Sequence, residues 1–254
     1  MRKLFLLFCF CGIAALPAAG DAGKKILYPD ASNYREFRYH ALIIGVDIAP
    51  VKGSGSTCHD PFAAQLAGFL KNWGCFSKGG IAVLKGGLGT KQRVKETITN
   101  LRLGPKDVLL IYYGGHGDWF GLSTSDKQSL SPEELSEYMA RSGAGFKALL
   151  ISACYSGLFA DPDDKGRCFQ RPGFAVVTSG EEDATSTYTS KGIGFGPYLW
   201  KLLNAKDKEP HGFVTLGEFV DLIKRENQHW KKNGKFRLSD GLNYGPKDSV
   251  LFWK

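Results

Sequence analysis

The sequence predicts an α/β fold with a mostly parallel sheet and helices on both faces of that sheet. Short apolar runs alternate with helical patterns from residue 39 to the C-terminus, and this alternation is typical of βαβ units. Two of the runs, Val108–Tyr113 and Ala148–Ile151, are apolar throughout, as strands buried on both faces are. A helical pattern at 131–141 separates them and supplies the crossover that parallel neighbours require.

The first βα unit follows from local signals. Residues 39–46 predict the first central strand, and residues 47–57 form a loop rich in Gly, Pro and Ser. Asp60 and Pro61 suit the start of a helix. Apolar residues then recur at helical spacing up to Trp73, where Gly74 ends the pattern.

Two further helices carry capping signals. Thr90 precedes a helix expected at 91–101, and Ser131 begins a Ser-Pro-Glu-Glu run at the start of the helix at 131–141. Residues 119–130, between the apolar strand Val108–Tyr113 and that helix, are expected to form a loop. The other expected elements are strands at 81–84, 173–179 and 249–253 and helices at 192–204 and 215–227.

The N-terminal segment has the pattern of a secretory signal. Residues 1–20 carry two basic residues, an apolar run from Leu4 to Leu16 and a small-residue segment that ends at Gly20. The apolar run is shorter than the roughly 20 residues of a spanning helix, so no stable membrane insertion is expected after its removal. We therefore expect a secreted or periplasmic protein, with a polar, exposed leader at 21–38 and one domain at 39–254.

Composition excludes several classes of protein. Hydrophobic residues make up 43% of the chain, enough for a sizeable core. The formal net charge is +8, but Lys and Arg are scattered rather than gathered into a long basic stretch. Nucleic acid is therefore not expected as a partner. No spacing of Cys or His suggests zinc, and neither a metal nor another cofactor is expected.

Four cysteines follow the signal segment: Cys58, Cys75, Cys154 and Cys168. Cys58 and Cys75 flank a helical pattern that would hold them roughly 20 Å apart, too far for a disulfide. The sequence does not decide whether Cys168 forms a disulfide with either of them.

Two reactive residues follow neighbouring strands. His116 lies among Gly114, Gly115 and Gly117 after the first apolar strand, and Cys154 follows the second. A lone Cys or His is more often structural, but parallel neighbours end at the same edge of a sheet. A thiol needs a nearby imidazole to form a thiolate near neutral pH. The pattern therefore predicts a Cys–His catalytic pair.

These residues resemble the caspase-like cysteine peptidases, the group of caspases, metacaspases, legumains and gingipains. The resemblance rests on Tyr-Tyr-Gly-Gly-His-Gly at 112–117 and Ile-Ser-Ala-Cys-Tyr-Ser-Gly at 151–157. Bacterial metacaspase-like proteins, of peptidase family C14, look nearest, and legumain-type peptidases come second. The resemblance implies a caspase-like three-layer sandwich over most of the chain. It also implies an oxyanion hole formed by the backbone N–H groups of Gly117 and Cys154.

The resemblance leads to an expectation for substrate binding. Asp60 matches the acid that lines the pocket for the residue before the cut in metacaspases, although it could equally be a helix cap. Gly114 stands where metacaspases have Ser, and Ser152 stands where they carry a second pocket acid. The expected function is a secreted cysteine endopeptidase acting on peptides or proteins, with Arg or Lys before the cut. A catalytically silent binding domain and a legumain-like Asn-specific peptidase or transpeptidase are the alternatives.

An acidic stretch after the Cys strand raises one more possibility. Residues 161–167 contain three Asp together with Lys165 and Arg167. By resemblance to metacaspases, this stretch could bind an activating calcium ion or be cut by the enzyme itself. A solvated turn is the simpler interpretation, and calcium activation has no independent support in the sequence.

Overall fold

A computed structural model places His116 and Cys154 at one edge of a six-stranded sheet. It describes residues 28–47, 59–76, 79–180, 188–189, 192–193, 196–209, 212–232 and 243–254. The strand order is β12-β8-β7-β3-β1-β2. In that order the strands are Asn243–Tyr244, Phe174–Thr178, Phe146–Ser152, Asp107–Gly114, Arg38–Gly45 and Gly80–Lys85. All neighbouring pairs are parallel except β12 with β8, so the predicted mostly parallel sheet is confirmed.

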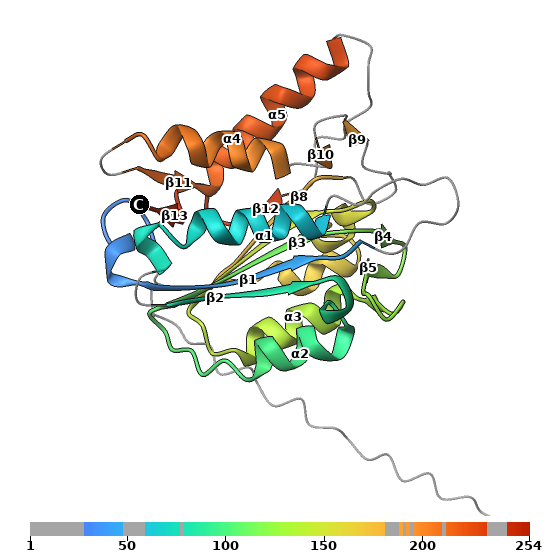
Figure 1. Cartoon of the computed structure of the whole chain (residues 1–254). Helices are drawn as coiled ribbons and strands as arrows, with labels where there is room; N and C mark the ends of the chain where they lie inside the picture. The colour runs from blue at the N-terminus through green and yellow to red at the C-terminus, as the bar shows by residue number, and fades with distance from the viewer. Residues whose placement is uncertain are drawn as a thin grey trace, which may run out of the picture.

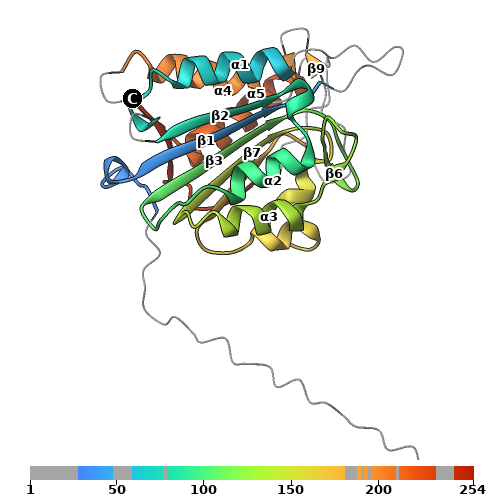
Figure 2. The same cartoon turned by 60° about the horizontal axis from the view of Figure 1, so that its bottom comes forward.

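Helices cover both faces of this sheet. The helices α1, α4 and α5 lie on one side, and α2 and α3 lie on the other (Figures 1 and 2). Their bounds are His59–Leu70 for α1, Lys91–Thr99 for α2, Pro132–Arg141 for α3, Gly196–Lys206 for α4 and Leu216–Lys232 for α5. This arrangement is the three-layer α/β sandwich that the sequence predicts.

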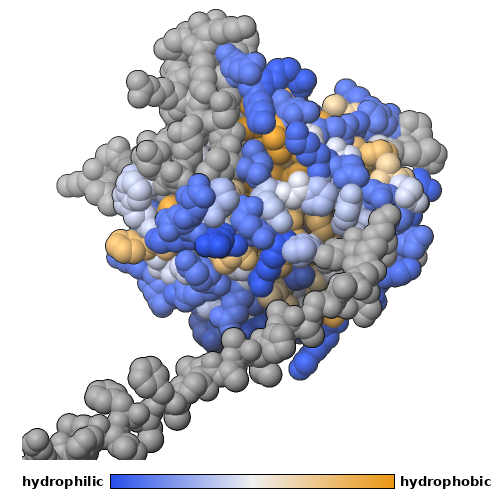
Figure 3. Space-filling view, turned by 180° about the vertical axis from the view of Figure 1, so that it is seen from behind, coloured by the Kyte–Doolittle hydropathy of each residue, from blue (hydrophilic) through white to orange (hydrophobic). Residues whose placement is uncertain are grey.

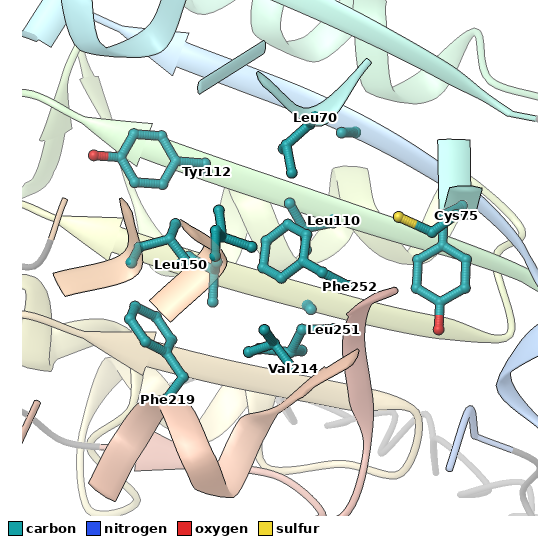
Figure 4. Close-up of a cluster of buried hydrophobic side chains, with 14 of the residues drawn as sticks. Leu70, Cys75, Leu110, Tyr112, Leu150, Val214, Phe219, Leu251 and Phe252 are labelled. Carbon is teal, nitrogen blue, oxygen red and sulfur yellow. The ribbon is translucent and has the colours of Figure 1, made fainter. Parts of the chain in front are cut away.

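Each face of the sheet has its own apolar core, because side chains alternate along a strand. On the α1 side, Leu110 and Leu150 pack with Leu70 and Phe219 (Figure 4). On the opposite side, the intervening strand residues pack against α2 and α3. Burial of each such side chain contributes about 1.5–3 kcal/mol. The two cores hold β3 and β7 rigidly at the centre of the molecule.

The crossover helix α3 begins where the sequence predicts. The Ser131 hydroxyl accepts a hydrogen bond from the Glu134 N–H (3.3 Å), and the Glu134 carboxylate accepts one from the Ser131 N–H (3.1 Å). Pro132 occupies the first turn. This capping box satisfies two N–H groups that a helix start leaves without partners. Thr90 caps α2 in a similar way, by accepting from the N–H of Arg93.

Smaller elements lie outside the central sheet. One is a three-stranded antiparallel sheet of β4, β5 and β6 in the segment after His116. The other two are the strand pairs β9 with β10 and β11 with β13, in the C-terminal half of the chain. The strands are Gly117–Asp118, Gly121–Ser123, Ser129–Leu130, Tyr188–Thr189 with Gly192–Ile193, and Phe213–Thr215 with Val250–Trp253. The 3-10 helices are Tyr34–Glu36, Gly74–Phe76, Gly86–Leu88, Ser156–Phe159 and Lys165–Phe169.

Several sequence expectations differ from the structure. The segment 119–130 is not an irregular loop, because it contains β5 and β6. The C-terminal strand pairs with β11 (Phe213–Thr215), a strand that the sequence did not indicate. The strand β10 (Gly192–Ile193) occupies the first residues of the helix expected at 192–204, which begins at 196. Periodicity predicted the apolar faces correctly, but it could not show which strand each segment pairs with.

The described part of the expected leader is packed rather than exposed. Tyr34 and Phe37 are buried, and the Tyr34 ring contacts those of Phe213 and Trp253. The Pro29 carbonyl accepts a hydrogen bond from the N–H of Val250. Residues 28–37 therefore belong structurally to the domain.

The predicted signal segment, 1–20, lies outside the described residues. Among the helices that are described, none combines the length and apolar character needed to span a membrane.

We predict that Ser131→Ala lowers the free energy of unfolding by about 1 kcal/mol, because it removes the cap of α3. Urea unfolding of the wild type and the variant measures this difference. Ser131→Asp is the matched control, since Asp also caps helices, and it should retain most of the stability. Equal stability of Ser131→Ala and the wild type would show that the capping box contributes nothing.

Candidate active site

His116 and Cys154 follow two neighbouring parallel strands, β3 and β7. The register pairs Gly114 with Ser152, the last residue of each strand. The Gly115 N–H donates to the Ser152 carbonyl (3.2 Å), so the two chains stay together beyond the paired strands. Both His116 and Cys154 are half-buried. The structure thus brings the two predicted residues to the same edge of the sheet.

Gly117 allows the histidine segment to lie directly on the cysteine segment. A methyl group at position 117 would stand 2.2 Å from the carbonyl oxygen of Cys154, closer than any side-chain carbon can approach. Only glycine fits this contact. The predicted oxyanion-hole residues, Gly117 and Cys154, are therefore in direct backbone contact.

The backbone of His116 is held by two hydrogen-bond donors. Its carbonyl accepts from the Ser123 N–H (2.9 Å) and from the hydroxyl of Tyr113 (2.8 Å). That hydroxyl also lies 2.6 Å from the carbonyl oxygen of Ser123. Tyr113 is buried in β3, so the sheet itself fixes the position of the histidine segment.

The backbone around Cys154 is fixed from the other side, by the segment after β8. The Ala153 N–H donates to the Ser179 hydroxyl (3.1 Å), and the Gly180 N–H donates to the Ser156 hydroxyl (2.9 Å). Tyr155, directly after Cys154, has a left-handed conformation with φ of +53°. A non-glycine residue in that region costs free energy, and such residues are concentrated at functional sites.

A second histidine, His59, lies against His116 and was not singled out from the sequence. The centroids of the two rings are 6.2 Å apart. His59 is only 3% exposed, and its Nε2 has no hydrogen-bond partner among the described residues. Burial, together with the nearby His116, lowers the pKa of His59 to about 4. His59 is therefore neutral at neutral pH and adds no positive charge beside His116.

His59 also explains the glycine at position 114. A methyl group on Gly114 would lie 3.1 Å from Nδ1 of His59 and 3.1 Å from the hydroxyl of Tyr112. Both contacts are tighter than ordinary van der Waals packing. The space that a side chain at 114 would need is thus occupied by the imidazole of His59.

Asp60 lies in the first turn of α1 and is not the cap of that helix. The cap is Asp47, whose carboxylate accepts hydrogen bonds from the N–H groups of His59 (3.0 Å) and Asp60 (3.1 Å). Asp60 is half-buried, and its Oδ1 has no hydrogen-bond partner among the described residues. The capping interpretation of Asp60 is wrong, which leaves its carboxylate for another role.

Ser152 and Gly114 lie side by side on the α1 face of the sheet. Their strand pairing and the alternation of side chains place both on the face that Tyr112 and Leu150 share. Ser152 is completely buried. Of the residues expected to bind substrate, Asp60 is therefore more accessible than Ser152.

Burial disfavours the thiolate form of the other described cysteines. Cys75, Cys154 and Cys168 all carry thiols rather than disulfides. Burial raises the pKa of Cys75 to about 12, and it also raises the pKa of Cys168. Cys58, for which a bridge was considered, lies outside the described residues.

No cluster of three or more His, Cys, Asp or Glu within the described residues is arranged to hold a metal ion. In the acidic stretch after β7, the Asp161 carboxylate accepts a hydrogen bond from the N–H of Asp163, which forms a local turn.

This arrangement of sheet and helices is that of the caspase-like fold. Caspase-1 from Spodoptera frugiperda has a TM-score of 0.58 and 17% identity, over 89% of this chain and 92% of that chain. Protein GSU0716 from Geobacter sulfurreducens has a TM-score of 0.54 and 13% identity, over 85% and 92% of the two chains. At such identities the likeness establishes the fold.

Comparison of the sequence with models of protein families identifies the family. The model of the peptidase C13 family matches residues 78–239, and the chain belongs to that family. None of the curated proteins compared with the chain matches its sequence. Membership of a cysteine-peptidase family agrees with the expected class of protein.

Within the caspase-like group, the assignment differs from the expectation. The motifs placed the chain nearest to metacaspases of family C14, whereas the match is to C13, the legumain-like family. The metacaspase assignment is therefore not confirmed. The departures at Gly114 and Ser152 were the signals in the sequence that pointed away from it.

We predict that His59 makes the protein less stable in mild acid. Between pH 6.5 and 4 the unfolded chain protonates this imidazole and the folded chain does not, so the free energy of unfolding falls as the pH is lowered through that window. The contribution reaches about 2–3 kcal/mol at pH 4.5. Urea unfolding at pH 7 and pH 4.5 should show a smaller acid loss in His59→Gln than in the wild type. An identical loss in both proteins would contradict the prediction.

Proposed function

We propose that this chain is a secreted cysteine endopeptidase that hydrolyses peptide bonds through an acyl-enzyme on Cys154. The observation that supports this most strongly is the close contact of the His116–Gly117 segment with Cys154 at the edge of β3 and β7. Membership of the peptidase C13 family supports the same class of reaction. The secretory pattern of residues 1–20 supports a secreted or periplasmic location.

The reaction has two steps. Cys154 Sγ attacks the carbonyl carbon, its proton passes to His116, and the imidazole then gives a proton to the leaving amine. Water next attacks the thioester, with His116 as the base, and releases the acid product and the thiol. The N–H groups of Gly117 and Cys154 would stabilise the oxyanion, and loss of one such donor typically costs about 10²–10³ in rate. Cys154 and His116 together supply the nucleophile and every proton transfer that the two steps require.

Asp60 supports cleavage after Arg or Lys. Its carboxylate is half-buried, one residue from His59, and its Oδ1 lacks a partner among the described residues. A basic side chain would supply the missing donors, and a partly buried acid gains most from a charged partner.

Cleavage after Asn, or transfer to an amine, is the second candidate function. The C13 match favours it. His59 and Ser152 lie beside the catalytic pair on the α1 face, and both are uncharged. Uncharged neighbours suit a substrate with Asn before the cut better than one with Arg or Lys. A thioester is attacked by amines as well as by water, so the same site serves a transpeptidase.

We predict that the wild type cleaves fluorogenic peptides after Arg or Lys and that Cys154→Ala removes this activity completely. Cys168→Ala is the matched control, because it removes another half-buried thiol and should cleave normally. Calcium is added in a parallel series, to test for activation. No turnover by the wild type in any series would favour a silent binding domain.

The same peptide panel separates the two candidate specificities. If Asp60 forms the pocket for a basic residue, Asp60→Asn should lower kcat/KM for Arg and Lys peptides by about 10²-fold, the value of a buried charge-assisted contact. Cleavage after Asn that Asp60→Asn does not affect would support the catalytic pair but would contradict a pocket for Arg or Lys at Asp60. Ligated products on addition of an amine would identify a transpeptidase.

A further inference from the structure

Two aromatic side chains project into solvent beside the candidate active site. Trp119 is 54% exposed and Phe120 is 72% exposed, and only Leu88 joins them as a highly exposed large hydrophobic residue in the described part of the chain. They form the tip of the β4–β5 hairpin, which lies beyond the end of β3 (Figure 1). The space-filling view from behind shows that hydrophobic residues take up little of a mainly hydrophilic surface (Figure 3).

The hairpin does not need aromatic residues at its tip. Asp118 pairs with Gly121, so Trp119 and Phe120 are the two central residues of the turn. Gly, Asn and Asp favour such positions, whereas large apolar residues there gain little from folding. Their exposure leaves apolar area in water that a ligand could cover.

The tip is rigid. The Asp118 carboxylate accepts hydrogen bonds from the N–H groups of Phe120 (2.8 Å) and Gly121 (3.1 Å). Gly121 has φ of +144°, and a methyl group there would lie 2.2 Å from the carbonyl oxygen of Leu130. The backbone that carries the two rings is therefore fixed before any ligand arrives, which lowers the entropic cost of binding.

The tip is also attached to the segment that carries Cys154. The rings of Trp119 and Tyr155 are 4.7 Å apart, and Tyr155 directly follows Cys154 in its left-handed conformation. The ammonium group of Lys165 donates to the carbonyl of Trp119 (2.6 Å). Trp119 and Tyr155 thus form an aromatic surface that begins one residue from the nucleophile, and Phe120 is the next residue of the same turn.

The hairpin that carries Trp119 and Phe120 packs away from α1, the helix that carries His59 and Asp60. His59 and Asp60 approach the catalytic pair from α1, whereas Leu122 of the hairpin packs into the core on the α2 and α3 side. The amine that leaves takes its proton from His116, so the substrate chain after the cut starts at this imidazole. The hairpin begins at Gly117, the next residue.

We propose that Trp119, Phe120 and Tyr155 form a subsite for an apolar or aromatic side chain just after the cut. The inference rests on the proposed peptidase function and adds a substrate preference to it. An apolar side chain of the substrate would cover the exposed rings and gain both burial and aromatic contact. Acidic or glycine residues at that position would gain neither.

The test compares peptides that differ only after the cut. Quenched fluorogenic peptides with Phe, Leu, Gly or Asp at each of the first two positions after the cut are assayed with the wild type. We expect kcat/KM to favour Phe and Leu over Gly by about tenfold, a typical value for an apolar pocket. The double variant Trp119→Ala, Phe120→Ala should bring this ratio close to 1. Leu88→Ala, which removes an exposed apolar side chain outside the hairpin, should keep the ratio.

Each other outcome overturns a definite claim. A double variant that loses activity on all peptides equally, with the ratio retained, would show that the rings have a structural role and would overturn the subsite. Cleavage by the wild type without any preference would overturn the subsite alone. Failure of the wild type to cleave any of these peptides would overturn the proposed function, and the subsite with it.

Discussion

The parallel pairing of β3 with β7 is the constraint on which the rest of the site depends. It brings Gly114 opposite Ser152, so the segments that carry His116 and Cys154 leave the sheet side by side. Beyond the strands, Gly117 lies so close to the Cys154 carbonyl that no side chain fits between them. The buried hydroxyl of Tyr113 and the side chains of Ser156 and Ser179 then hold both segments in place. A rigid sheet edge of this kind orients reacting groups at little entropic cost during the reaction.

The electrostatic environment of the pair is largely neutral on the α1 side. His59 contacts His116 and is kept neutral by burial. A protonated imidazole in that position would repel a protonated His116 and so destabilise a thiolate–imidazolium pair. Of the described acidic residues on this side, Asp47 is engaged with the start of α1, and Asp60 lies beside Gly86. The described side chain of α1 that contacts His116 is thus neutral.

The sequence predicted the parts of this structure that depend on local patterns. The buried strands, the caps at Thr90 and Ser131 and the crossover between β3 and β7 all follow from short stretches of sequence, and so does the shared edge of His116 and Cys154. The contacts made by residues distant in sequence could not be predicted. Asp47 caps a helix that begins 12 positions later, at His59, and therefore shows no capping spacing.

Other errors have the same origin. His59 reads as an ordinary residue in a Cys-His-Asp-Pro run, and only the packing of α1 on β3 places it against His116. The aromatic tip at Trp119 and Phe120 was expected within a loop because no Asn-Gly or similar pair marks the hairpin. The segment at 28–37 is polar enough to predict exposure, yet Tyr34 and Phe37 are buried against other parts of the chain.

The central claim is that His116 and Cys154 act as a pair, and the pH dependence of Cys154 alkylation tests it most directly. Iodoacetamide is reacted with the wild type and with His116→Ala from pH 5 to pH 9, and mass spectrometry of the Cys154 peptide gives the rate. The account predicts that the wild-type thiol ionises well below the ordinary value of about 8.5 and that the variant returns to about that value or above. Identical pH profiles in the two proteins would show that the imidazole does not activate the thiol.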